Sequence, residues 1–203
     1  MRMKLPLLIA GGLLLGGCLG LLLVPGALNR ILPQGGVRSI GEATVGGPFT
    51  LTDHKGRRVT EQEWRGKYML IFFGFTFCPD VCPTALQVSA SALDKLGAKA
   101  DRVVPLFISV DHERDTPEIL ERYVSSFHPR LVGLTGSAEE ITSVTRAYRV
   151  YYKKTKDEKS AAGYTIDHSS IVYLMGPDGK FITHFTHTTS PDAMAAALAR
   201  NLK

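Results

Sequence analysis

The chain has few cysteines and only a small excess of positive charge. Its 203 residues include three cysteines, and 24 Lys and Arg against 19 Asp and Glu give a formal net charge of +5. Three cysteines are too few for a small fold held together by disulfides. The charge surplus is also too small to indicate a nucleic-acid-binding protein. We therefore expect one globular domain with an ordinary hydrophobic core and no nucleic acid partner.

Charged residues are absent from Leu5 to Asn29, a stretch that contains the run LLIAGGLLLGGCLGLLLVPGAL. At about 1.5 Å per residue, this run is long enough to cross a hydrocarbon core about 30 Å thick. A cleaved signal peptide has a shorter apolar core of about 7–15 residues. The run therefore predicts an uncleaved membrane anchor over residues 1–28. Arg2 and Lys4 should stay on the cytoplasmic side, which places the remaining chain in the periplasm, tied to the inner membrane by a single pass.

A bacterial lipoprotein is the alternative for this segment, because Leu15-Gly-Gly-Cys18 resembles a lipoprotein processing box. The apolar residues Leu19–Val24 argue against lipidation of Cys18, since a polar tether normally follows a lipidated cysteine. Both interpretations place the rest of the chain at a membrane surface. Residues 29–47 are rich in Gly and Pro and predict a tether, which leaves residues 48–203 as one domain.

No internal repeat is present, and predicted strands alternate with predicted helices. This order is typical of an α/β fold, and in particular of a thioredoxin-like three-layer sandwich with a mixed central sheet. The expected strands are a hairpin over 48–59, buried strands over 68–75 and 103–110, a short strand over 131–135, a strand over 149–153 and a hairpin over 170–185. The expected helices cover 83–96, 116–127, 137–147 and 191–202. In the third, Ser137 is expected to be the N-cap, with Glu140 completing a capping box.

The two cysteines outside the predicted anchor lie close together in Cys78-Pro-Asp-Val-Cys82-Pro83. A residue before proline is disfavoured in the helical region, which predicts that Cys82 is the N-cap and Pro83 the first helical residue. The positive end of the helix dipole favours a thiolate at this place. Asp80 is expected to be a turn residue.

Such a pair can exchange disulfides or bind a soft metal. A disulfide between Cys78 and Cys82 is chemically plausible in an exported domain, although it would close too small a loop to stabilise the fold. Thiolates also select Cu(I), zinc or iron–sulfur clusters. Two cysteines are too few for a cluster or a closed zinc site, so a metal would need a ligand from elsewhere in the chain.

Among six histidines, His168 is the best candidate for that ligand. It precedes the predicted strand at 171–174, where redox-active thioredoxin-like proteins usually have a cis-proline. This chain has no proline from Arg130 to Gly176. His112 follows a buried strand and lies near the same sheet edge. A structural, hydrogen-bonded role for His168 is as consistent with the sequence as metal binding. The remaining histidines are expected at the surface or on opposite strand faces: His54, His128, His184 and His187.

Three motifs in this order resemble the Sco/SenC family: Cys78-Pro-Asp-Val-Cys-Pro83, Ser109-Val-Asp-His-Glu-Arg-Asp-Thr-Pro117 and Tyr164-Thr-Ile-Asp-His-Ser169. The resemblance runs from about Phe49 to the C-terminus. It implies a thioredoxin-like domain that binds one copper ion, Cu(I) or Cu(II), through Cys78, Cys82 and His168. It also implies a copper metallochaperone that assists assembly of the dinuclear copper centre in a cytochrome c oxidase subunit, with other copper chaperones or thiol reductants as further partners.

The same dithiol supports an alternative in which Cys78 and Cys82 are catalytic and the protein reduces the cysteines of the oxidase subunit. A peroxidase is disfavoured because the Thr-x-x-Cys arrangement is missing. His112 stands where the family commonly has proline, and it offers a possible extra ligand. Asp111 and Asp115 match an acidic pair of the family, and their positions are equally consistent with a helix-capping or structural role. Asp167 is a candidate for orienting His168.

Overall fold

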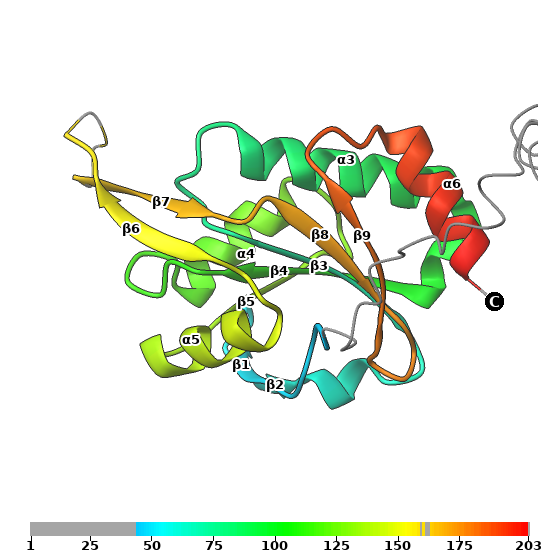
Figure 1. Cartoon of the computed structure of the whole chain (residues 1–203), viewed down its shortest axis with the longest axis horizontal. Helices are drawn as coiled ribbons and strands as arrows, with labels where there is room; N and C mark the ends of the chain where they lie inside the picture. The colour runs from blue at the N-terminus through cyan, green and yellow to red at the C-terminus, as the bar shows by residue number, and fades with distance from the viewer. Residues whose placement is uncertain (1–43, 159, 161–162, 203) are drawn as a thin grey trace, which may run out of the picture. The chain divides into compact units, whose positions relative to one another are not determined.

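The computed structural model describes residues 44–158, 160 and 163–202, drawn in colour in Figure 1. The predicted anchor and most of the predicted tether lie outside these residues. Within the described part of the chain, no helix is both long and apolar enough to cross a membrane. The membrane anchor thus stays a prediction from the sequence. Residues Thr44–Lys203 form one compact unit.

A seven-stranded sheet forms the centre of this unit, in the order β2-β1-β5-β4-β3-β8-β9. β3, β4 and β5 are parallel, whereas the pairings β1–β2, β1–β5, β3–β8 and β8–β9 are antiparallel. The predicted mixed sheet is confirmed. Its strands are β1 (Thr50–Asp53), β2 (Arg58–Thr60), β3 (Tyr68–Gly74), β4 (Val103–Ser109), β5 (Val132–Thr135), β8 (Ile171–Met175) and β9 (Phe181–Thr186).

Helices cover both faces of the sheet, which completes three layers. In Figure 1, α3 and α6 lie together on one side of the sheet and α5 lies on the other. The helices are α3 (Val81–Leu96), α4 (Pro117–Ser125), α5 (Ala138–Ala147) and α6 (Pro191–Asn201), with short 3-10 turns at Glu61–Trp64 and Gly97–Arg102. The capping box predicted for Ser137 and Glu140 is present at the start of α5.

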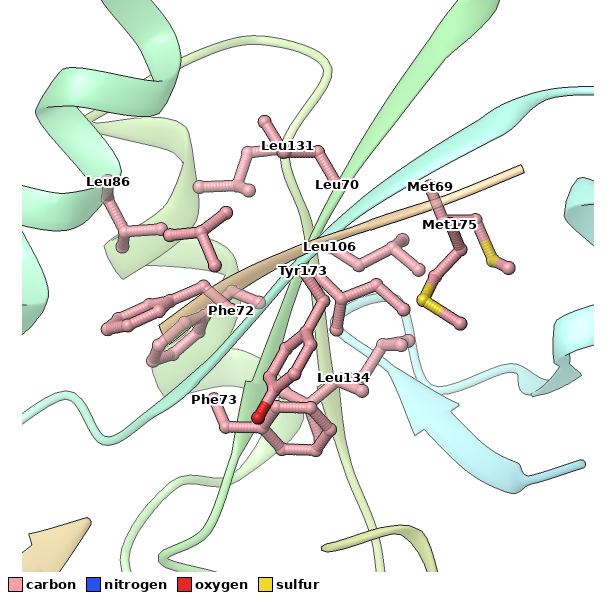
Figure 2. Close-up of a cluster of buried hydrophobic side chains, with 14 of the residues drawn as sticks. Met69, Leu70, Phe72, Phe73, Leu86, Leu106, Leu131, Leu134, Tyr173 and Met175 are labelled. Carbon is pink, nitrogen blue, oxygen red and sulfur yellow. The ribbon is translucent and has the colours of Figure 1, made fainter. Parts of the chain in front are cut away.

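The core is built around β3, whose seven residues are all buried. Successive side chains of a strand point to opposite faces. Phe72 accordingly packs on Phe107 beneath α3, whereas Phe73 packs on Tyr148 and Tyr173 on the opposite face. Figure 2 shows Phe72, Phe73 and Tyr173 with leucine and methionine side chains around them. Burial of each large side chain contributes roughly 1.5–3 kcal/mol, so the end of β3, where the cysteine loop begins, is firmly held.

A separate two-stranded ribbon consists of β6 (Tyr152–Lys156) and β7 (Tyr164–His168). It extends from one end of the main sheet in Figure 1. The predicted strand at 149–153 corresponds to β6, shifted by three residues. β7 falls in a stretch for which the sequence predicts no strand, because five residues with a single aliphatic side chain, Ile166, give too weak an apolar pattern. Its last residue is His168.

Candidate metal centre

Cys78, Cys82 and His168 come together at one end of the main sheet. The Cys82 Sγ and His168 Nε2 atoms are 3.4 Å apart, and the ligand atoms of all three residues lie within 4.8 Å of one another. Metal–sulfur and metal–nitrogen distances of about 2.0–2.3 Å separate the ligands of one ion by about 4 Å. The three donors therefore fit a single ion with little movement. Among the described residues, this is the one group of three or more His, Cys, Asp or Glu side chains that could hold a metal ion.

Cys82 lies in the first turn of α3, not at its N-cap as the sequence predicted. α3 begins at Val81, Asp80 is the N-cap, and the Asp80 side chain makes no capping hydrogen bond. The preference of a pre-proline residue for extended backbone is overridden here. Pro83 falls in the first turn, where backbone N–H groups have no partner within the helix, so its missing N–H costs little. The backbone of Cys82 is thus held within the helix itself.

The Cys82 sulfur rests on the backbone of β3 at Gly74. A Cβ atom at Gly74 would lie 2.7 Å from Cys82 Sγ and 2.9 Å from Phe107 Cε2, closer than such atoms approach. A glycine is therefore required for the sulfur to reach this depth. The sequence held a signal for this contact, because an isolated glycine in a buried strand often marks a close approach by another group.

The two thiols have very different proton affinities. A hydrogen bond from the Cys82 thiol lowers the pKa of Cys78 to about 4, against the opposing effect of burial, with His168 and backbone N–H groups lowering it further. One of these N–H groups is that of Cys82, 3.4 Å from Cys78 Sγ. The pKa of Cys82 is raised, because its proton is held in the bond to Cys78 and its sulfur is buried. Both cysteines are free. With the pKa of Cys78 lowered to about 4 and that of Cys82 raised, the pair carries one thiolate at neutral pH.

The His168 imidazole is oriented by its immediate neighbours. Its Nδ1 atom lies 3.2 Å from the backbone carbonyl oxygen of Ser169, which leaves Nε2 to face the sulfurs. The rings of Phe72 and Phe75 meet the imidazole edge-on at 6.0 and 5.8 Å between centroids. This arrangement is typical of a metal-binding histidine whose second nitrogen is fixed by a carbonyl.

The proposal that Asp167 orients His168 is wrong. Adjacent residues of a strand point to opposite faces, and Asp167 is exposed and accepts a hydrogen bond from Thr155 at 3.0 Å. The orienting carbonyl of Ser169 is a backbone group, and its role could not be identified from side-chain chemistry.

Asp111 and Asp115 are buried beside the centre but are not among its ligand atoms. The Asp115 carboxylate accepts hydrogen bonds from the Thr76 N–H at 3.0 Å and the Thr76 hydroxyl at 2.6 Å. Burial raises the pKa of Asp115 despite these bonds. Asp111 is paired with Arg114. Both carboxylates therefore bind other parts of the protein, in agreement with the structural role considered from the sequence.

The other histidines of the described region do not join the centre. His112 is exposed, so the expectation of an additional ligand from this residue is not met. His184 and His187 are also exposed, as their odd spacing predicted for at least one of them. His54 and His128 bond to backbone groups of Gly133 and Arg130.

Comparison with known proteins gives consistent results over most of the chain. A family model described as SCO1/SenC matches residues 37–203. The chain is 46% identical over 166 residues to SCO1 homolog 1 of Arabidopsis thaliana and 46% identical over 169 residues to the human mitochondrial SCO1 homolog. These matches cover 81% and 82% of this chain, and 49% and 56% of the relatives. The chain thus spans about half the length of the curated relatives it matches.

Two solved structures are similar throughout the described domain, and both are of copper-bound proteins. Arabidopsis thaliana ScoI with copper bound has a TM-score of 0.74 and 46% identity, covering 78% of this chain and 98% of that one. Bradyrhizobium japonicum ScoI with copper bound has a TM-score of 0.71 and 48% identity, covering 77% and 98%. The predicted thioredoxin-like α/β fold is confirmed, and the Cys–Cys–His donor group suits copper. On its sequence and its fold, the chain belongs to the SCO1/SenC family.

Proposed function

We propose that this protein is a copper metallochaperone that carries one copper ion on Cys78, Cys82 and His168. The observation that carries the proposal is the convergence of these three donors, with all ligand atoms within 4.8 Å of one another. His168 is 86 residues from Cys82 in the chain, so no local feature of the sequence accounts for their contact. Two thiolates and one imidazole form a donor set that favours Cu(I) and also accommodates Cu(II).

The exposure of the donors supports transfer of the metal. Cys82 is fully buried, whereas Cys78 and His168 are partly accessible to solvent. Three protein ligands leave a Cu(I) ion open to a further thiolate from an acceptor. Copper then passes from donor to acceptor by ligand exchange, without release as a free ion. On loading, Cys78 contributes an existing thiolate, and Cys82 gives up the proton that it shares with Cys78.

The acceptor that we propose is the dinuclear copper centre of a cytochrome c oxidase subunit. Sco proteins take part in the assembly of this oxidase. Other copper chaperones or thiol reductants would load or reduce the site. Residues 1–28 would anchor the protein in the inner membrane, residues 29–47 would form a tether, and residues 48–203 would present the copper domain in the periplasm. Support for the anchor comes from the uncharged apolar stretch between Leu5 and Asn29.

The direct test compares the full chain with His168→Ala and His112→Ala, both reduced and then loaded with Cu(I). We expect one copper ion per chain in the native protein. Because His168→Ala removes a direct ligand, Cu(I) affinity should fall by at least about a hundredfold. His112→Ala replaces an exposed histidine outside the donor group and should bind as tightly as the native protein. Equal affinity for all three proteins would contradict the proposed site.

A thiol–disulfide reductase that prepares the oxidase cysteines is the second candidate. It is favoured by the asymmetric dithiol, in which Cys78 has a pKa of about 4 and is partly exposed while Cys82 is protonated and buried. Cys78 would attack the target disulfide, and Cys82 would then release the target by forming the Cys78–Cys82 disulfide. A reductase should keep most of its activity in His168→Ala, whereas a metallochaperone should lose delivery.

A further inference from the structure

Two neighbouring residues between β4 and α4 contact the two separate parts of the metal centre. We call the segment Val110–Thr116 the β4–α4 loop. Asp115 of this loop is completely buried, and its carboxylate holds Thr76 through both the backbone N–H and the side-chain hydroxyl. Ser109, the last residue of β4, also donates a hydrogen bond to Asp115. Because Thr76 lies two residues before Cys78, Asp115 fixes the approach to the cysteine pair.

Arg114, the adjacent residue, holds the first residue of the strand that carries His168. Its guanidinium carbon lies 3.8 Å from the centroid of the Tyr164 ring, and its Nη1 donates to the Tyr164 carbonyl at 3.4 Å. The Arg114 Nε pairs with Asp111, whose other carboxylate oxygen accepts the Tyr164 hydroxyl at 2.9 Å. Tyr164 is thus held by its ring, its carbonyl and its hydroxyl, and β7 is held with it.

The same guanidinium also reaches the cysteine loop. It lies 4.8 Å from the centroid of the Phe77 ring and 5.8 Å from that of Phe75. Only 13% of the Arg114 side chain is exposed, and its Nη2 is buried with no hydrogen-bond partner in the described part of the chain. An unpaired buried N–H group is costly. Arg114 bears this cost at a position where its guanidinium contacts both the cysteine loop and the first residue of β7.

We infer that Arg114 and Asp115 are positioning residues that set the distance between the cysteine pair and His168. This inference rests on the proposed function. The ribbon forms its own sheet and is joined to β8 of the main sheet by only two residues, so its position relative to the cysteines depends on this short link and on side-chain contacts. The β4–α4 loop provides such contacts on both sides, through Asp115 to the cysteine loop and through Arg114 to β7. Loss of the Arg114 contact should let β7 move and carry the imidazole away from the sulfurs.

The test uses the full chain and the variants Arg114→Met, Arg114→Lys and Asp115→Asn, with Arg122→Met as the matched control. Arg122 is an exposed arginine on α4. We expect Arg114→Met to lose about 10- to 100-fold in Cu(I) affinity, the range typical of groups that orient metal ligands. X-ray absorption of the copper-loaded variant should show two sulfur donors and a weakened or missing imidazole. Arg114→Lys keeps the charge but not the planar fork, so its affinity should be intermediate.

A second measurement needs no metal. In the reduced apo protein, the NMR signals of the His168 ring should shift in Arg114→Met and in Asp115→Asn, but not in Arg122→Met. A residue that only stabilises the fold would lower the unfolding temperature and leave the imidazole signal and the copper coordination unchanged. If Arg114→Met has a lower unfolding temperature but an unchanged imidazole signal and copper coordination, the inference is overturned. This holds even if Asp115→Asn fails to fold.

His168→Ala in the same series separates this inference from the proposed function. If His168→Ala loses the imidazole signal in X-ray absorption and Arg114→Met keeps it, the copper site is correct and the positioning role is wrong. If native protein and His168→Ala give identical copper spectra, the copper site itself is wrong. Loss of imidazole coordination in both variants, with Arg122→Met unchanged, supports both proposals.

Discussion

The cysteine half and the histidine half of the metal centre are held in contrasting ways. Cys82 follows β3, a central strand with seven buried residues, and its sulfur rests against the backbone of Gly74. His168 ends a two-stranded ribbon in which four of the five residues of β6 are exposed. The sulfurs are therefore built into the domain, whereas the imidazole is brought to them by a peripheral element. In the proposed copper carrier, one of the three ligands thus lies on an element that few contacts outside the ribbon hold, chiefly those of Arg114 with Tyr164.

Hydrogen exchange of the apo protein tests this contrast, and we expect it to give the largest effect of the proposed experiments. Amides of β3 and β4 should exchange only through global unfolding, whereas those of β6 and β7 should exchange through local opening. We expect the ribbon to exchange at least about a thousandfold faster than β3. Mass spectrometry of peptides from both regions measures the difference. Addition of Cu(I) should slow exchange in β7 if His168 binds the ion; equal protection of both regions in the apo protein would remove the contrast.

The reactivity of Cys78 tests whether the ribbon influences the cysteine half. With a pKa of about 4, Cys78 is a thiolate at neutral pH, so its alkylation rate should be constant above about pH 5 and should fall about tenfold per unit below the pKa. His168 helps to lower this pKa. In His168→Ala the pKa should therefore rise, and the fall in rate should begin at higher pH. Rates of iodoacetamide labelling, followed by mass spectrometry, give both profiles. An unchanged profile would show that the two halves act independently.

Gly74→Ala tests how rigid the cysteine half is. The new methyl group would clash with Cys82 Sγ and with Phe107, both of which are fully buried. Such overpacking should lower the free energy of unfolding by about 1–3 kcal/mol, measured by urea denaturation. Gly47→Ala, whose nearest contact would lie at 3.3 Å, is the matched control and should change stability less. A neutral Gly74→Ala would mean that the sulfur can shift freely, contrary to the rigid position described above.

Lys154→Gln should have the smallest effect. The Lys154 Nζ lies 2.7 Å from Glu113 and 3.9 Å from the Tyr164 ring centroid, but about half of each charged side chain is exposed. Exposed pairs of this kind contribute little. We expect copper affinity to change by about twofold or less, and any change in unfolding temperature to vanish at high salt. A large loss of affinity would show that the exposed contacts of Lys154 with Glu113 and Tyr164 position the ribbon, and not mainly those of Arg114.

The sequence predicted the parts of the fold that depend on local patterns. The continuous apolar run at 68–75 became the buried strand β3, and Ser137 with Glu140 formed the expected capping box. The sequence did not predict β7 as a strand, because its five residues include a single aliphatic side chain, Ile166, and give no distinctive apolar pattern. The N-cap at Cys82 was also wrong, since the preference before proline is weak enough for a helix start to override it.

By itself, the sequence determined the chemistry of the centre: two thiols four residues apart at the start of a helix, and a short set of histidines from which a partner could come. The sequence singled out His168 as the best candidate, but only the tertiary structure decided that it meets the sulfurs and at what distance, because the pairing of β6 with β7 and the contacts of Arg114 join segments far apart in the chain. The types of ligand are a property of composition and spacing. Their meeting point depends on long-range packing, which no local pattern encodes.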